Sequence, residues 1–152
     1  MDILGQGFGF DDPEKLILDV AAGMREKNGS EVSRIVLHTG LKLFPFSSKV
    51  RSDLICDTWN VLSQYGNDEV LLNDVVDLTS ETYLKDVLPD AKEVICYYGL
   101  CALVLNNAEV DEITSYLQEF VYPNVNLSSL KVKIKDLLDN PTAFSARDLK
   151  VI

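Results

Sequence analysis

The chain contains 152 residues, of which 47% are hydrophobic and 25% are charged, and its formal net charge is −10. This composition excludes an intrinsically disordered chain, because such chains combine few hydrophobic residues with a high net charge. A chain of this length buries roughly 70% of its unfolded surface when it folds. We therefore expect one globular domain.

Acidic residues are concentrated in the middle of the chain. Residues 1–51 hold seven acidic and seven basic residues, residues 52–130 hold fourteen acidic residues and two lysines, and residues 131–152 hold three acidic and five basic residues. No nucleic-acid partner is expected, because nucleic-acid binding depends largely on Lys and Arg. A protein with a basic surface would fit the acidic middle; the alternative is an acidic surface that only maintains solubility.

The first helix signal is the pair Asp12-Pro13, and Asn28-Gly29 ends that helix. The residues expected to face the core from this helix are Leu16, Ile17, Val20, Ala21 and Met24. From the next helix, at 30–43, the expected core residues are Val32, Ile35, Val36, Thr39 and Leu43. The expected solvent face of that second helix consists of Glu31, Arg34, His38 and Lys42.

Residues 48–65 show the clearest amphipathic pattern. The apolar stripe contains Val50, Leu54, Val61, Leu62 and Tyr65, with Trp59 beside it. The opposite, polar row contains Lys49, Asp53, Asp57, Asn60 and Gln64. Asp53 and Asp57 lie one turn apart, as a carboxylate pair that shares a proton or a metal would, but we expect this row to be a solvated helix face.

Further helices are expected at 68–78, in a short piece at 83–88, at 90–106 and at 110–121. Asp90 and Glu93 have the spacing of a capping box at the start of the 90–106 helix. Residues 127–138 fit either a helix or an edge strand, and we favour a helix. The expected organisation is a flexible leader at 1–11, an all-α domain at 12–140 and a tail at 141–152. The tail either packs back onto the domain, or the chain is a fragment whose partner surface is missing.

The helix at 90–106 is expected at the centre of the fold. Its apolar run is too short for the roughly 20 residues of a membrane helix, so no membrane partner is expected. Cys96 and Cys101 are expected to be small core groups, and Gly99 to have a neighbour packed against its backbone. The fold class is therefore all-α: a compact bundle of about seven antiparallel helices.

The sequence shows no catalytic, cofactor or metal site. His38 is the only histidine, and the Gly-rich run at 4–10 lacks the spacing of a phosphate-binding loop. The cysteines are odd in number and no secretory leader is evident, so we expect reduced thiols and an intracellular, cytoplasmic protein, with the nucleus as an alternative. The residues we expect to contact a partner are Phe8, Phe10, Asp53, Asp57, Asp111, Glu112 and Glu119.

Two segments resemble the helices of HEAT and armadillo repeat proteins. They read "SSKVRSDLICDTWNVLSQYGNDEVL" (47–71) and "PDAKEVICYYGLCALVLNN" (89–107). Val50 and Val94 lie 44 positions apart, close to the length of such repeats, roughly 40–47 residues. The resemblance implies a HEAT-like protein-binding scaffold without catalytic residues.

These features favour a non-enzymatic protein–protein interaction module with an acidic central surface, acting as an adaptor, a regulator or a subunit of a larger assembly. The first alternative is a structural or assembly component, including a viral one, that self-associates. The second is an enzyme whose carboxylate or thiol lies among residues assigned to the surface or the core.

Overall fold

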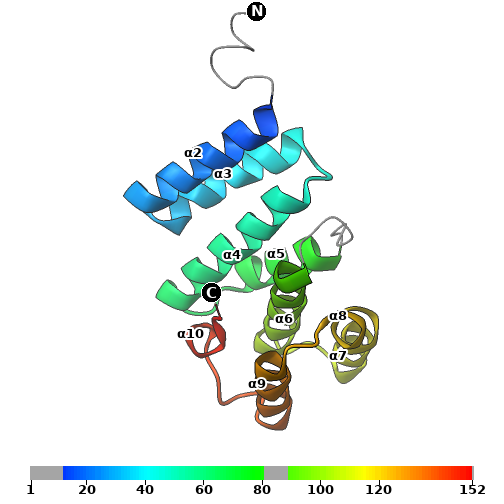
Figure 1. Ribbon diagram of the computed structural model, residues 1–152. Coiled ribbons are helices and arrows are strands. Elements are labelled where there is room, and N and C mark those ends of the chain that lie inside the picture. The colour runs from blue at the N-terminus through cyan, green and yellow to red at the C-terminus, as the bar shows by residue number, and fades with distance from the viewer. Residues whose placement is uncertain (1–11, 81–88, 152) are drawn as a thin grey trace, which may run out of the picture.

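The computed structural model describes residues 12–80 and 89–151, and every regular element in these ranges is helical (Figure 1). The elements are α2 (Pro13–Asn28), α3 (Ser30–Leu43), α4 (Ser48–Tyr65), α5 (Glu69–Ser80), α6 (Pro89–Leu105), α7 (Val110–Tyr116), the π-helix η2 (Leu117–Val121), α8 (Tyr122–Asn124), α9 (Ser128–Asp139) and α10 (Ala146–Leu149). The all-α prediction is confirmed, and the segment that fits either a helix or a strand forms the helix α9 (Ser128–Asp139). Phe8, Phe10 and the segment at 83–88 lie outside the described residues.

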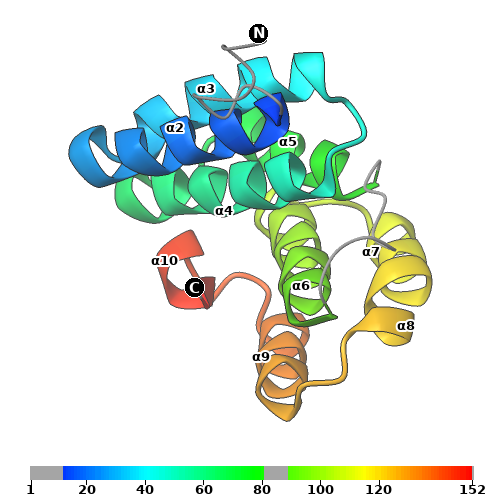
Figure 2. The same ribbon diagram turned by 45° about the horizontal axis from the view of Figure 1, so that its top comes forward.

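Helices α2 and α3 form an antiparallel hairpin that lies as a layer on α4 (Figures 1 and 2). The side chain of Asp12 accepts a hydrogen bond from the Lys15 amide at 3.0 Å and caps α2. The two helices approach closely at Gly40, where an added Cβ would lie 2.6 Å from Cγ2 of Ile17. Gly40 therefore sets the spacing of the hairpin.

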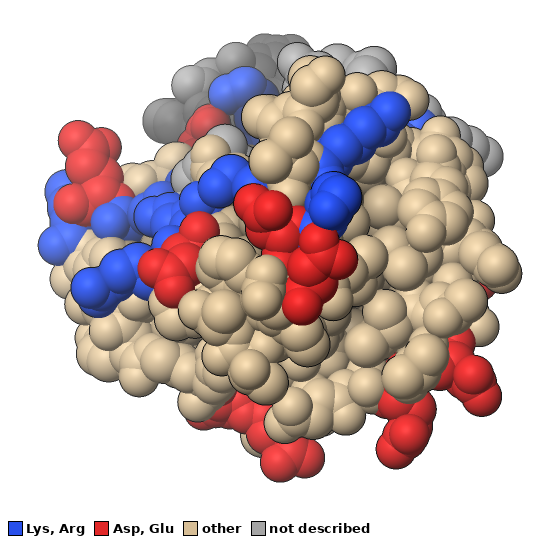
Figure 3. Space-filling view, turned by 90° about the horizontal axis from the view of Figure 1, so that it is seen from below, with Lys and Arg blue, Asp and Glu red and all other residues tan. Residues whose placement is uncertain are grey.

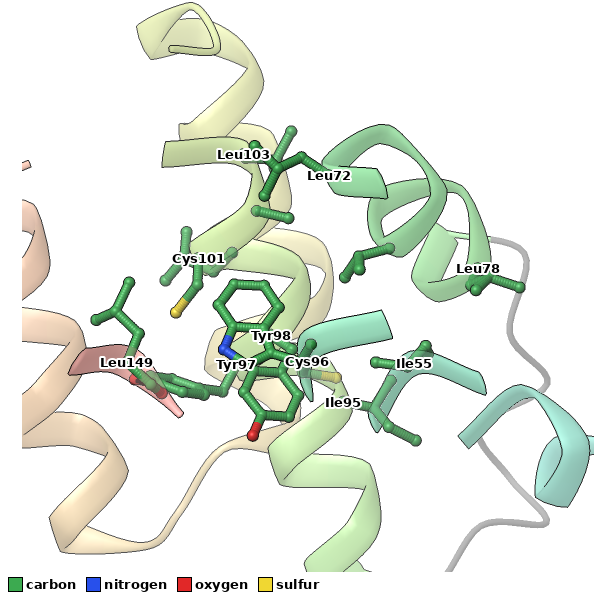
Figure 4. Close-up of a cluster of buried hydrophobic side chains, with 14 of the residues drawn as sticks. Ile55, Leu72, Leu78, Ile95, Cys96, Tyr97, Tyr98, Cys101, Leu103 and Leu149 are labelled. Atoms are coloured by element: carbon green, nitrogen blue, oxygen red, sulfur yellow. Dashed lines mark hydrogen bonds between the residues drawn. The ribbon is translucent and has the colours of Figure 1, made fainter. Parts of the chain in front are cut away.

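Helix α6 is the centre of the fold, as predicted. It packs against α4, α5, α7, η2, α8, α9 and α10. Figure 4 shows Tyr97, Tyr98 and Cys101 of α6 among side chains from α4, α5 and α10. Cys96 and Cys101 are buried free thiols.

Gly99 has the close neighbour that its place in the sequence predicts. A Cβ at this position would overlap the Tyr116 hydroxyl and lie 2.7 Å from Cζ of Tyr116 and 2.8 Å from Oγ1 of Thr79. The Tyr116 hydroxyl donates to the carbonyl of Cys96 at 3.0 Å. The absent side chain is what lets α7 pack directly on the α6 backbone.

The C-terminal segment packs back onto the core. Nε1 of Trp59 donates to the Ala146 carbonyl at 2.9 Å, and the Tyr97 hydroxyl donates to the Leu149 carbonyl at 2.8 Å. The Tyr98 hydroxyl accepts from the amide of Val151 at 3.1 Å. Residues 141–151 therefore belong to the domain.

The predicted capping box at Asp90 and Glu93 is wrong. Helix α6 begins at Pro89, so Asp90 already lies inside it. Oε1 of Glu93 instead accepts hydrogen bonds from the backbone amides of Asn126 and Leu127, the latter at 2.7 Å. A buried carboxylate of α6 thus satisfies amides just before α9 begins.

Candidate functional site

The polar side chains that suggested chemistry in the sequence mostly join helices to one another. Asp57 is 1% exposed and accepts hydrogen bonds from Nε and Nη2 of Arg25 at 2.6 and 2.9 Å. Oγ of Ser33 also donates to this carboxylate. The cluster ties α2, α3 and α4 together, so the predicted solvated face is wrong at Asp57, which is not available to a partner.

Asp53 and Cys56 lie near this cluster without forming a reactive pair. Burial raises the pKa of Asp53 above its ordinary value. Burial, with the nearby Asp53 carboxylate, raises the pKa of the Cys56 thiol to about 12. At neutral pH this thiol is protonated, and the protonated form is a poor nucleophile.

A second polar network joins α3, α4 and α5. Nε of Arg34 donates to Oγ1 of Thr58 at 2.9 Å, and Nη2 lies 3.3 Å from Oδ2 of Asp74 and 3.3 Å from Nε2 of His38. Burial and the Arg34 charge lower the pKa of His38. His38 and Arg34 are half-buried, so the prediction that they form a solvent face is wrong.

The other acidic candidates are exposed. Asp111 and Glu112 occupy the first turn of α7, where the helix dipole favours negative charge, and Glu119 lies on η2. The helix dipole therefore accounts for the acidic residues at the start of α7 without any bound ligand. They remain accessible to a basic partner.

The strongest candidate is an apolar surface on the α2–α3 hairpin. Leu16, Val20 and Met24 of α2 are between 36% and 41% exposed, and Ile35 and Leu43 of α3 are 66% and 64% exposed. We call these five residues the outer hairpin face. The sequence pattern predicts that they face the core, and that prediction is wrong.

Helical geometry places the five residues on one side of the hairpin. The side chain of Ile17 lies against Gly40 of α3, and this contact marks the side of α2 that faces α3. The side chain of Arg25 pairs with Asp57 of α4, and this pair marks the side of α2 that faces α4. At 100° per residue, Leu16, Val20 and Met24 lie beyond Ile17 on the side away from Arg25. On α3, Gly40 faces α2 and Arg34 faces α4 through its hydrogen bond to Thr58. The same rotation of 100° per residue then places Ile35 and Leu43 on the side of α3 away from α4.

The residues that α3 buries are Ser33, Leu37 and Gly40. Two of them are small or polar, so hydrophobic periodicity misses this face. The sequence feature that identifies the buried face of α3 is the small size of its side chains, because small residues permit close helix contacts. The outer hairpin face was therefore hidden among residues assigned to the core.

Within the described ranges, no helix has the length and apolar character needed to cross a bilayer. Nor do those ranges contain a group of three or more His, Cys, Asp or Glu residues arranged to hold a metal ion. Comparison with protein-family models, curated proteins and solved structures finds no match to this chain. The candidate site therefore depends on the geometry of the chain alone.

Proposed function

We propose that this chain is a non-enzymatic protein–protein interaction module, an adaptor, regulator or subunit of a larger assembly, and that the outer hairpin face is its main contact surface. One observation carries the proposal. An apolar stripe at helical spacing, of the kind that helices normally bury, is exposed on both helices of the hairpin. Contiguous apolar patches of this kind commonly mark protein-binding sites.

The size of the face suits the core of an interface. Helix α3 has 14 residues and is therefore about 21 Å long, and packed helices lie about 10 Å apart. Two such helices offer a face of roughly 400 Å², about half of what one partner contributes to a standard interface. We infer that a partner helix or hairpin covers this face and that polar neighbours complete the contact.

Charge also favours this side of the molecule. Residues 12–46 contain five acidic and five basic residues, whereas the whole chain has a net charge of −10. A partner that approaches the hairpin therefore meets little net repulsion. A stack of helical layers, as in HEAT-like proteins, would continue from this face, because terminal layers of such proteins otherwise have polar outer surfaces.

The test compares proteins that co-purify with three forms of the chain from its source cell. The forms are the wild type, the double variant Ile35→Glu/Leu43→Glu, and the control Val132→Glu, which changes an apolar residue on α9 that is 59% exposed. The proposal predicts that a specific partner is lost with the double variant and retained with the control. Identical recovery with all three forms would refute it.

Self-association is the second candidate function, because the face is apolar and near neutral and so suits a second copy. Sedimentation velocity over a range of concentrations separates the two functions. A dimer that Ile35→Glu converts to a monomer favours self-association. A monomer at every concentration favours a different partner.

The exposed acids Asp111, Glu112 and Glu119 belong to a separate part of the proposal, in which a partner with a basic surface docks on α7 and η2. Binding of this kind weakens as salt is added. Insensitivity to salt would remove this part and leave the outer hairpin face untouched. We further propose an intracellular, cytoplasmic location, because the three cysteines are free thiols.

A further inference from the structure

A groove lies at the other end of the molecule from the outer hairpin face, between η2 and α8 on one side and α9 on the other. Its volume is about 460 Å³, within the range of roughly 300–1,000 Å³ typical of ligand sites. Val121, Val125 and Ile134 form its nearly buried floor. We call it the α8–α9 groove.

The walls of the α8–α9 groove are open to solvent. Tyr122 is 65% exposed and Leu138 is 37% exposed, so two large apolar side chains border the floor without being covered. Figure 3 shows the end of the molecule that contains α9, where charged side chains lie beside a broad uncharged area. An occupant would therefore contact apolar and charged groups together.

Two features of the chain define the frame of the groove. The π-helix η2 leads into one wall, and π-helical turns are frequent at functional sites. The buried Glu93 carboxylate accepts from the amides of Asn126 and Leu127 and so fixes the chain between α8 and α9. A preformed site loses less entropy on binding than a flexible one.

The charged residues that line the groove are Lys131, Lys135 and Asp139, so the lysines outnumber the single carboxylate. Lys131 has no ion-pair partner among residues 12–80 and 89–151. Among the described residues, Lys135 pairs only with Asp139, which lies one turn away at 2.9 Å and also lines the groove, and exposed pairs of this kind are weak. Both ammonium groups can therefore receive a carboxylate from an occupant.

We propose that the α8–α9 groove binds a peptide segment of another protein that carries apolar side chains next to Asp or Glu. The apolar side chains cover the floor, Tyr122 and Leu138, and the carboxylates pair with Lys131 and Lys135. A fatty acid has the same combination of groups but needs an enclosed channel for its alkyl chain, and the walls here are open. This proposal is independent of the outer hairpin face.

The test is a selection of short random peptides displayed on phage against the full chain. Peptides that also bind the variant Tyr122→Ser, which alters an exposed apolar wall of the groove and leaves both lysines in place, are removed. The expected result is enrichment of motifs that combine apolar residues with Asp or Glu. Enrichment of basic or purely apolar motifs would overturn the proposal, and so would the absence of enrichment.

A synthetic peptide with the enriched motif then allows a quantitative test by fluorescence anisotropy. The double variant should weaken binding about tenfold or more, and Leu138→Ser should also weaken it, whereas the control Lys49→Glu on α4 should leave it within about twofold. Equal melting temperatures show that the variants fold. Unchanged binding by the double variant, or displacement of the peptide by a fluorescent long-chain fatty acid that binds more tightly, would overturn the choice of a peptide as the occupant.

Discussion

Gly99 illustrates how a single absent side chain determines the packing of two helices. The space above its backbone is filled by the Tyr116 hydroxyl, which bonds to the Cys96 carbonyl, and by Thr79. We expect Gly99→Ala to destabilise the fold by about 1–3 kcal/mol, because overpacking outweighs the better helix propensity of alanine.

The matched control is Gly23→Ala in α2. A Cβ at Gly23 meets nothing within 4 Å, so alanine should stabilise the protein by up to about 1 kcal/mol there. Urea denaturation measures both changes in the free energy of unfolding. If Gly99→Ala is as stable as Gly23→Ala, α7 does not pack on the α6 backbone as described.

Asp57 and Asp53 offer a second matched pair at this scale, one turn apart on α4. Asp57→Asn leaves the Arg25 guanidinium without its counter-ion and should cost about 3 kcal/mol, the low end for a buried pair because Arg25 is partly exposed. Asp53→Asn should cost less than about 1 kcal/mol, since burial already disfavours that carboxylate. Equal losses in chemical denaturation would show that Asp57 does not hold the three helices.

The environment of His38 predicts that the free energy of unfolding depends on pH. Its pKa is lowered in the folded state by burial and by Arg34, so the unfolded chain binds the proton more tightly. The contribution of neutral His38 is present above pH about 6.5 and is lost as the pH falls. The difference in unfolding free energy between wild type and His38→Gln should therefore decrease from pH about 7.5 to about 5.5; a constant or rising difference would contradict the burial of His38.

Some of these residue environments could be predicted from the sequence and others could not. The close contact at Gly99 was predictable because glycine is costly inside a helix. The burial of Asp57 was not, because helical periodicity describes one apolar face, whereas α4 is covered on one side by the hairpin and on the other by α6. A polar side chain between two layers looks like a surface residue in the sequence.

At the level of elements, α10 shows that four residues at the end of the chain can complete a core. Leu149 is 2% exposed, and its carbonyl and that of Ala146 accept hydrogen bonds from Tyr97 and Trp59. Leu149→Ala should destabilise the fold by about 2–5 kcal/mol. Trp59 is the only tryptophan, so its fluorescence should shift to longer wavelength if α10 detaches.

Leu127→Ala is the control for this change, because Leu127 is 43% exposed on the loop before α9. It should cost much less than Leu149→Ala and leave the emission of Trp59 unchanged. Equal effects of the two variants on stability would show that α10 is not part of the core.

Element boundaries were more predictable than element faces. The end signal Gly29 adopts a positive φ angle, as does Gly66 at the end of α4, and α4 begins and ends at the predicted residues. The face that α3 buries was not predictable from hydrophobicity, because close packing at Ser33 and Gly40 selects small residues. The same preference leaves Ile35 and Leu43 on the outside.

At the scale of the whole molecule, the two proposed contact surfaces lie at opposite ends of the fold and differ in character. The outer hairpin face is apolar and near neutral in charge, and the α8–α9 groove combines an apolar floor with lysines. A module with two such surfaces can hold two partners at once, as an adaptor does. Each surface can be disabled by substitutions that leave the core untouched.

The central claim is that the outer hairpin face is covered by a protein in the cell. Site-specific photo-cross-linking tests it most directly, with the photoreactive amino acid placed at Ile35 in one form and at the exposed Val132 of α9 in another. We predict a discrete cross-linked product from position 35 that Leu43→Glu removes and that position 132 does not give. No product from position 35, or the same products from both positions, would contradict the claim.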